Sequence, residues 1–111
     1  MIRVFYRILL LYLLFGGYNL NLTIKIPENV FSSVNSEKCI ILNYENGSYY
    51  GLDSIGNEYW DLMNKYNDFN LIVEKMLIKY PDVSKEIIES DLSELIEKLT
   101  KNELITVIQN D

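Results

Sequence analysis

The pair Asn46-Gly47 constrains the fold of this 111-residue chain more than any other feature of the sequence. A two-residue type I′ turn needs positive φ at both central residues, and Asn-Gly meets that requirement best. We therefore expect a β-hairpin in which residues 39–43 and 48–52 are antiparallel neighbours. The second of these strands, SYYGL, carries two adjacent tyrosines and a glycine but no charge. The use of that strand is the main question that the sequence raises.

One further strand is expected before the hairpin. LTIKIP, residues 22–27, alternates apolar and polar side chains and ends at a proline, which cannot donate to a strand ladder. Residues 28–38, ENVFSSVNSEK, are polar and rich in turn formers, so we expect a loop there. The sequence thus predicts a three-stranded antiparallel sheet of residues 22–27, 38–43 and 48–52.

Three helices are expected after the sheet. Residue 53 or 54 is the predicted N-cap of the first helix. Asp68 and Ser84 are the predicted N-caps of the second and third, because their side-chain oxygens can accept from free N–H groups of a first turn. Apolar residues recur at three- and four-residue spacing in all three segments. The apolar tail LITVIQ, residues 104–109, is expected to pack back as an extended piece, and strands followed by helices indicate the α+β class.

The strand 48–52 is predicted to lie at an edge of the sheet. Exposed edges are usually protected by charge, proline or a covering element, and this strand has neither charge nor proline. One explanation is that another part of the chain covers it. The other is that a peptide adds to it as a further strand, with backbone hydrogen bonds for affinity and side-chain pockets for specificity.

Charge is distributed unevenly along the chain. Both arginines, Arg3 and Arg7, lie near the N-terminus, and eight lysines and sixteen acidic residues follow from position 22 onward, a net charge of −8. Proteins that bind a phosphate backbone need clustered Lys and Arg. The charge therefore argues against nucleic acid as a partner.

The chain has one cysteine, Cys39, and no histidine. An internal disulfide is therefore impossible, and the usual general base and zinc ligand are missing. Cys39 lies within CIIL, where a thiol usually behaves as a small apolar core residue. No nucleophile–base pair or Gly-rich phosphate loop is visible. We expect no enzymatic activity, no catalytic residue, no metal and no cofactor.

Residues 1–21 differ from the rest of the chain. Two basic residues precede eight consecutive apolar ones, residues 8–15, and Gly16-Gly17 follows. The apolar run is shorter than the roughly 20 residues of an ordinary membrane span. A secretory signal, a membrane anchor, a surface amphipathic segment and an over-extended reading frame all stay open. We divide the chain into this segment and one domain, residues 22–111.

A set of spaced positions runs from the second predicted strand into the first helix. It joins a leucine-bearing strand, a glycine turn, a tyrosine pair and a helix with glycine and tryptophan. Its members are Leu42, Gly47, Tyr49, Tyr50, Leu52, Asp53, Gly56, Trp60, Leu62 and Met63. This set resembles the PqqD-like family, named after the peptide chaperone of pyrroloquinoline quinone biosynthesis, and most of all its type from lasso peptide pathways. With the two following helices, the resemblance covers roughly residues 22–107.

The resemblance implies a winged-helix-like recognition element for ribosomally synthesised, post-translationally modified peptides (RiPPs). Such a peptide chaperone has no chemistry of its own. It binds the leader of a precursor peptide as an added strand and presents it to a processing enzyme, in the lasso case a leader peptidase. Here the leader would lie against residues 48–52, in a groove bordered by the third helix. The residues that the resemblance assigns to peptide binding are Tyr49, Tyr50, Gly51, Leu52, Asp91, Leu92, Glu94, Leu95, Ile96 and Leu99.

These assignments have ordinary structural alternatives. Tyr49 and Tyr50 point to opposite faces of a strand, so only one can line a groove, and the other is expected in the core. The apolar stripe on the third helix is core by default, and only its flank toward the strand can touch a ligand. Asp91 and Glu94 can equally form a solvated face.

Two other functions stay open. A winged-helix DNA-binding regulator has a compatible order of elements but needs a basic recognition helix, and residues 84–101 hold more acids than lysines. A generic protein-interaction adaptor is the second alternative, and it could contact a membrane through residues 1–21. We expect a cytoplasmic protein, with membrane association through the N-terminal segment as the alternative.

Overall fold

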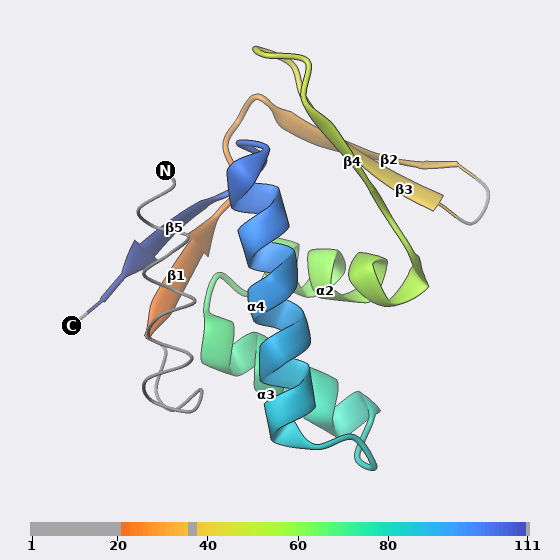
Figure 1. Cartoon of the computed structure of the whole chain (residues 1–111), viewed down its shortest axis with the longest axis vertical. Helices are drawn as coiled ribbons and strands as arrows, with labels where there is room; N and C mark the ends of the chain where they lie inside the picture. The colour runs from red at the N-terminus through yellow and green to blue at the C-terminus, as the bar shows by residue number, and fades with distance from the viewer. Residues whose placement is uncertain (1–20, 36–37, 111) are drawn as a thin grey trace.

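The computed structural model describes residues 21–35 and 38–110 (Figure 1). In chain order its elements are β1 (Leu22–Lys25), β2 (Val30–Asn35), β3 (Lys38–Asn43), β4 (Tyr49–Leu52), α2 (Ser54–Lys65), α3 (Phe69–Lys79), α4 (Lys85–Lys101) and β5 (Thr106–Gln109). A three-stranded antiparallel sheet and three helices confirm the predicted α+β class. The apolar segment 1–20 lies outside the described residues, so the division of the chain before residue 22 stays a prediction.

The main sheet has the order β2-β3-β4, and all its neighbours are antiparallel. The predicted hairpin is confirmed, because β3 and β4 pair on either side of a turn at Gly47. Gly47 has a φ of 75°, which glycine adopts without steric cost. Asn46 lacks the positive φ of a type I′ turn, and its side chain instead accepts from the Ser48 N–H at 2.8 Å. The loop is therefore longer than the two-residue turn that the sequence predicts.

Two parts of the predicted sheet were wrong. Residues 30–35, predicted as a loop, form β2 and pair with β3 along their whole length. The central strand β3 is buried on one face and has N–H and C=O groups on both edges to satisfy, and β2 supplies the second edge despite its serines. β1 belongs to a separate two-stranded sheet with β5, because Leu22 and Ile24 are buried at 1% and 0% exposure in a core that the C-terminal tail completes. The predicted return of that tail as an extended piece is confirmed.

Each helix begins at a side-chain cap. Asp53 Oδ1 accepts from the Gly56 N–H at 2.7 Å at the start of α2. Asp68 caps α3, and Ser84 caps α4 by accepting from the Ile87 N–H at 3.3 Å. All three predicted caps are confirmed. In residues 21–35 and 38–110, no helix has the length and apolar character to cross a membrane.

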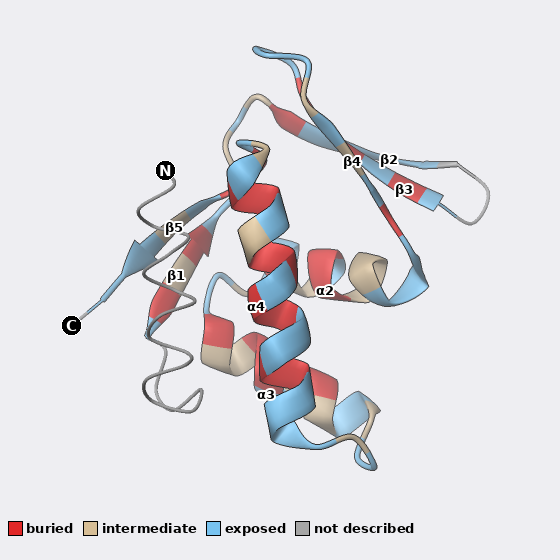
Figure 2. Cartoon of the chain, in the orientation of Figure 1, coloured by how far each residue is buried: buried red, intermediate tan, exposed pale blue. Residues whose placement is uncertain are grey.

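The core is centred on α4, whose buried stripe is visible along the helix in Figure 2. Leu92, Ile96 and Leu99 from α4 are completely buried. Trp60 from α2 and Phe69 from α3 pack in the same cluster. Full burial of each such side chain stabilises a fold by about 1.5–3 kcal/mol, so this stripe holds α4 in place. The exposed flank of α4, which carries Asp91, Glu94 and Lys98, is free of core packing.

Candidate functional site

β4 is an edge strand, because β3 is its only strand neighbour among the described residues. The Asn43 N–H donates to the Ser48 carbonyl at 2.8 Å, so Ser48 turns its main-chain groups toward β3. Main-chain direction alternates along an antiparallel strand. The even-numbered residues of β4 therefore pair with β3. The N–H and C=O groups of Tyr49 and Gly51 point to the free edge.

The side chains of β4 also alternate between the two faces of the sheet. Leu52 is 4% exposed and Tyr50 is half-buried against the core, so both face the helices. Tyr49 is 69% exposed and lies on the outer face of the sheet, opposite Leu42 in register. Tyr50 is therefore the tyrosine that can line a groove on the helix side of the sheet, and its role in peptide binding stays a prediction. The expectation that the other is a core residue was wrong.

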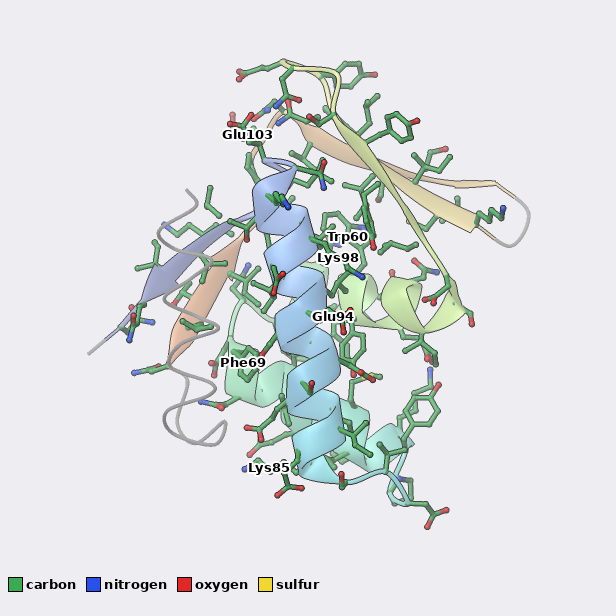
Figure 3. All side chains as sticks on the ribbon, viewed as in Figure 1. Trp60, Phe69, Lys85, Glu94, Lys98 and Glu103 are labelled. Atoms are coloured by element: carbon green, nitrogen blue, oxygen red, sulfur yellow. The ribbon has the colours of Figure 1, made fainter. Side chains whose placement is uncertain are left out.

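A groove of about 470 Å³ lies between the free edge of β4 and α4, next to the start of α2. Figure 3 shows Glu94 and Lys98 on the flank of α4 that looks toward β4 and α2. The groove is lined by Tyr50, Gly51, Leu52 and Asp53 from β4 and its end, by Ile55, Gly56 and Tyr59 from α2, and by Asp91, Glu94, Leu95 and Lys98 from α4.

Six of the ten residues that the resemblance assigned to peptide binding line this groove. They are Tyr50, Gly51, Leu52, Asp91, Glu94 and Leu95. Tyr49 contributes only its main chain to the free edge. Leu92, Ile96 and Leu99 are core residues with no exposed surface, so we leave their side chains out of the candidate site.

Sequence reasoning missed Asp53, the contribution of α2 and one residue of α4. Ile55 and Tyr59 lie one turn apart on the face of α2 that meets β4, and nothing local distinguishes that face from the rest of the helix. The sequence did contain a pattern that could have identified Lys98, because positions 91, 94 and 98 have the three- and four-residue spacing of one helix face. Asp53 could also have been identified, because it directly follows the strand.

The groove has an apolar floor and a charged rim. Leu52, Tyr59 and Leu95 are nearly buried, and Ile55 is 40% exposed. The Tyr59 hydroxyl donates to the Ile88 carbonyl at 3.5 Å. Burial, helped by the charge of Asp91, raises the pKa of Tyr59 to about 12. The protonated hydroxyl makes a long, weak hydrogen bond between α2 and α4.

The rim is mainly acidic. Glu94 pairs with Lys98 at 3.2 Å on the surface of α4, a contact that contributes little to stability when both groups are solvated. Burial raises the pKa of Asp91, and the Glu94 carboxylate adds to the rise. Asp53 keeps its carboxylate on the first turn of α2. The rim therefore favours cationic over anionic side chains in a ligand.

Two glycines shape the strand side of the groove. A Cβ on Gly56 would meet Leu52 Cδ2 and Asp53 Oδ1, each at 3.1 Å. This contact explains a glycine in the first turn of α2. A Cβ on Gly51 would meet nothing within 4 Å. Its position alternates with Tyr50 and Leu52, so this open space lies on the outer face of β4.

Comparison with known proteins gives one family match and two similar solved structures. Residues 38–105, more than half of the chain, match the family of coenzyme PQQ synthesis protein D (PqqD). Among curated proteins, no sequence matches the chain. Among solved structures, one similar chain is TbiB1 in complex with the TbiA(beta) leader peptide, with a TM-score of 0.66 and 28% identity over 73% of this chain and 93% of that chain.

A second solved structure has the same fold at lower sequence similarity. It is lasso peptide synthetase B1 complexed with the leader peptide, with a TM-score of 0.60 and 15% identity over 76% of this chain and 98% of that chain. The family match covers β3, the turn, β4, α2, α3 and α4, so it includes every residue that lines the groove. The chain belongs to the PqqD family.

Proposed function

We propose that this protein binds the leader segment of a precursor peptide as an added strand on β4. The main support is the free edge of β4, where the main-chain groups of Tyr49 and Gly51 point away from β3. This edge lies beside a groove with an apolar floor. A peptide in this position would extend the sheet to four strands. Its side chains on the inner face would enter the groove toward Tyr50 and Leu95.

Family membership supports a recognition role in the biosynthesis of a RiPP. Both similar solved structures hold a leader peptide, and both concern proteins with the same fold. We propose a lasso peptide pathway, with a leader peptidase or another modifying enzyme as the partner. The protein would act as a peptide chaperone that presents the precursor to this enzyme and performs no chemistry itself.

The place of action follows from the proposed ligand. Precursor peptides are ribosomal products, so a protein that receives them before processing would act in the cytoplasm. Contact with a membrane through residues 1–21 is compatible with this role, and residues 1–20 of that segment lie outside the described residues.

Charge weighs against the alternative of a DNA-binding regulator. A recognition helix needs Lys and Arg toward the phosphates, whereas the solvent-facing flank of α4 carries Asp91 and Glu94 beside Lys98. A general protein-interaction adaptor is the remaining alternative, and it would not need the main-chain edge of β4.

Capture of the ligand from lysate of the native host tests the proposal. The bait is the full chain in three forms: wild type, Gly51→Ala and Gly51→Pro. Alanine fits because its Cβ meets open space. Proline removes an N–H that points to the free edge, so pairing with β3 is kept. Circular dichroism confirms that all three are folded before use.

Wild type and Gly51→Ala should enrich one short precursor peptide through its N-terminal part, as identified by mass spectrometry. Gly51→Pro should retain roughly tenfold less, because the added strand loses a main-chain hydrogen bond and meets the proline ring. Equal capture by folded Gly51→Pro would exclude this edge as the site. Capture of proteins but no peptide would favour an adaptor, and capture of DNA a regulator.

A further inference from the structure

A buried amide at the end of β3, Asn43, connects the turn before β4 to the end of α4. Asn43 is 4% exposed. Its Oδ1 accepts from the main-chain N–H groups of Glu45 at 2.9 Å and Asn46 at 3.3 Å, and from Asn29 Nδ2 at 2.8 Å. Main-chain N–H groups can only donate, so they determine which atom of the amide is the oxygen. The Asn43 Nδ2 group must then point the other way.

That nitrogen donates to the main-chain carbonyl of Glu103 at 2.8 Å. Glu103 follows the C-cap of α4 and has a φ of 59°, a conformation that few non-glycine residues adopt. Its own N–H donates to the Thr100 carbonyl at 3.0 Å, so it is attached to the last turn of the helix. Its carboxylate accepts a second hydrogen bond from Asn46 Nδ2. Figure 3 shows Glu103 at the end of α4, beside the hairpin.

These contacts join the two walls of the groove. β4 begins directly after the turn of the hairpin. On the other wall, the groove residue Lys98 lies about one helical turn before the end of α4. At the other end of the groove, β4 leads into α2, whose Tyr59 hydroxyl donates to α4. Between these two ends the groove separates β4 from α4. The hairpin contact with Glu103 is therefore placed to control their spacing.

We propose that Asn43 is a positioning residue, which holds the β3–β4 hairpin against the end of α4 through Glu103 and thereby sets the width of the groove. The proposal rests on the proposed function, because it concerns how tightly that groove holds a peptide. Asn43 touches no ligand in this account. Without its bond to Glu103, the exposed hydrogen bond between Asn46 and Glu103 is left to hold the turn. The turn can then move away from α4, and the inner side chains of the peptide lose contact with one wall.

The substitution Asn43→Asp separates this role from stabilisation of the hairpin itself. Aspartate keeps the oxygen that accepts from residues 45 and 46 but replaces the Nδ2 donor with an acceptor that repels the Glu103 carbonyl. Asn102→Asp is the matched control. Asn102 Nδ2 donates to the Lys98 carbonyl at 2.8 Å at the same end of α4, so the control makes the same chemical change without a contact to the hairpin.

Two measurements on the full chain test the proposal. The first is a distance measured by pulsed electron spin resonance between two nitroxide labels. The labels are attached to Glu45→Cys in the turn and Lys101→Cys at the end of α4, which are both exposed positions. Cys39 is buried, which limits labelling there. The second is the dissociation constant of the peptide identified by the capture experiment, at a temperature where circular dichroism shows each variant to be fully folded. Under that condition a purely structural role leaves affinity unchanged.

Asn43→Asp should give a longer and broader distance distribution than wild type, and peptide affinity should fall roughly tenfold. Asn102→Asp should match wild type in both measurements. An unchanged distance in Asn43→Asp overturns the proposal, and so does a longer distance with unchanged affinity. If wild type binds no peptide while the distance still increases in Asn43→Asp, the proposed function fails but the control of spacing by Asn43 stands.

Discussion

At the scale of single residues, the candidate site depends on the alternation of β4. Neighbouring residues of the strand present different groups: Tyr50 gives its side chain to the groove, whereas Gly51 gives its main chain to the free edge. Because the two kinds of contact come from adjacent positions, a bound strand would meet backbone donors and an apolar wall together. Affinity and specificity can then be changed separately by substitution.

The tyrosine pair provides a test of this division. Tyr50→Thr and Tyr49→Thr keep a good strand former at each position. Tyr50→Thr should weaken peptide binding roughly tenfold or more, because an aromatic wall of the groove is lost. Tyr49→Thr should change affinity less than about twofold, because its side chain lies on the outer face. Fluorescence anisotropy with a labelled peptide measures both, and an equal loss in the two variants would mean that the peptide contacts the outer face.

Glu89 on α4 provides a test of the buried charge. It is 4% exposed, and burial raises the pKa of its carboxyl from the ordinary 4.5, against the opposing effect of Lys85. Folding therefore favours the protonated form. Its stabilising contribution is complete below about pH 4.5 and is lost as the pH rises through the raised pKa of the folded state.

Glu89→Gln should consequently increase the free energy of unfolding at pH 7 by roughly 1 kcal/mol, and the gain should vanish below about pH 4.5. Urea unfolding at the two pH values measures the difference. Glu74→Gln, on the exposed side of α3, is the control and should have little effect at either pH. A gain for Glu89→Gln that is the same at both pH values would contradict a desolvated carboxylate.

At the scale of elements, local chemistry explains what the sequence could predict. The hairpin and the helix starts depend on residues within a few positions of each other, such as Gly47 and the caps Asp53 and Ser84. β2 could not be recognised locally, because Ser32 and Ser33 resemble a loop and the strand exists only through its pairing with β3. The partner of β1 is β5, more than 80 residues away, and no local pattern records such a pairing.

The same distinction applies to the candidate site. The unprotected edge of β4 was predictable, because charge and proline are absent from five consecutive residues. The groove flank of α4 was only partly predictable. Leu92 and Leu95 are both leucines in the apolar stripe of α4. Packing against the core nevertheless buries the first completely and leaves the second at the groove. Only the orientation of the whole helix decides between them.

At the scale of the whole molecule, the arrangement in Figure 1 places α4 between the two sheets. Its buried stripe anchors the core, its flank lines the groove, and its last turn receives the hairpin. One helix thus connects stability with the proposed binding site. The acidic rim suits a leader with basic side chains, and the net charge of −6 extends that preference beyond the contact surface.

The most direct test of the central claim is amide hydrogen exchange, measured by nuclear magnetic resonance with and without the captured peptide. In the free protein, the even-numbered residues of β4 should be protected by β3, and the amides of Tyr49 and Gly51 should exchange quickly. Peptide addition should slow exchange at Tyr49 and Gly51 together, because both N–H groups would donate to the added strand. Binding that leaves these two amides unprotected, or that protects the outer edge of β2 instead, would contradict strand addition at β4.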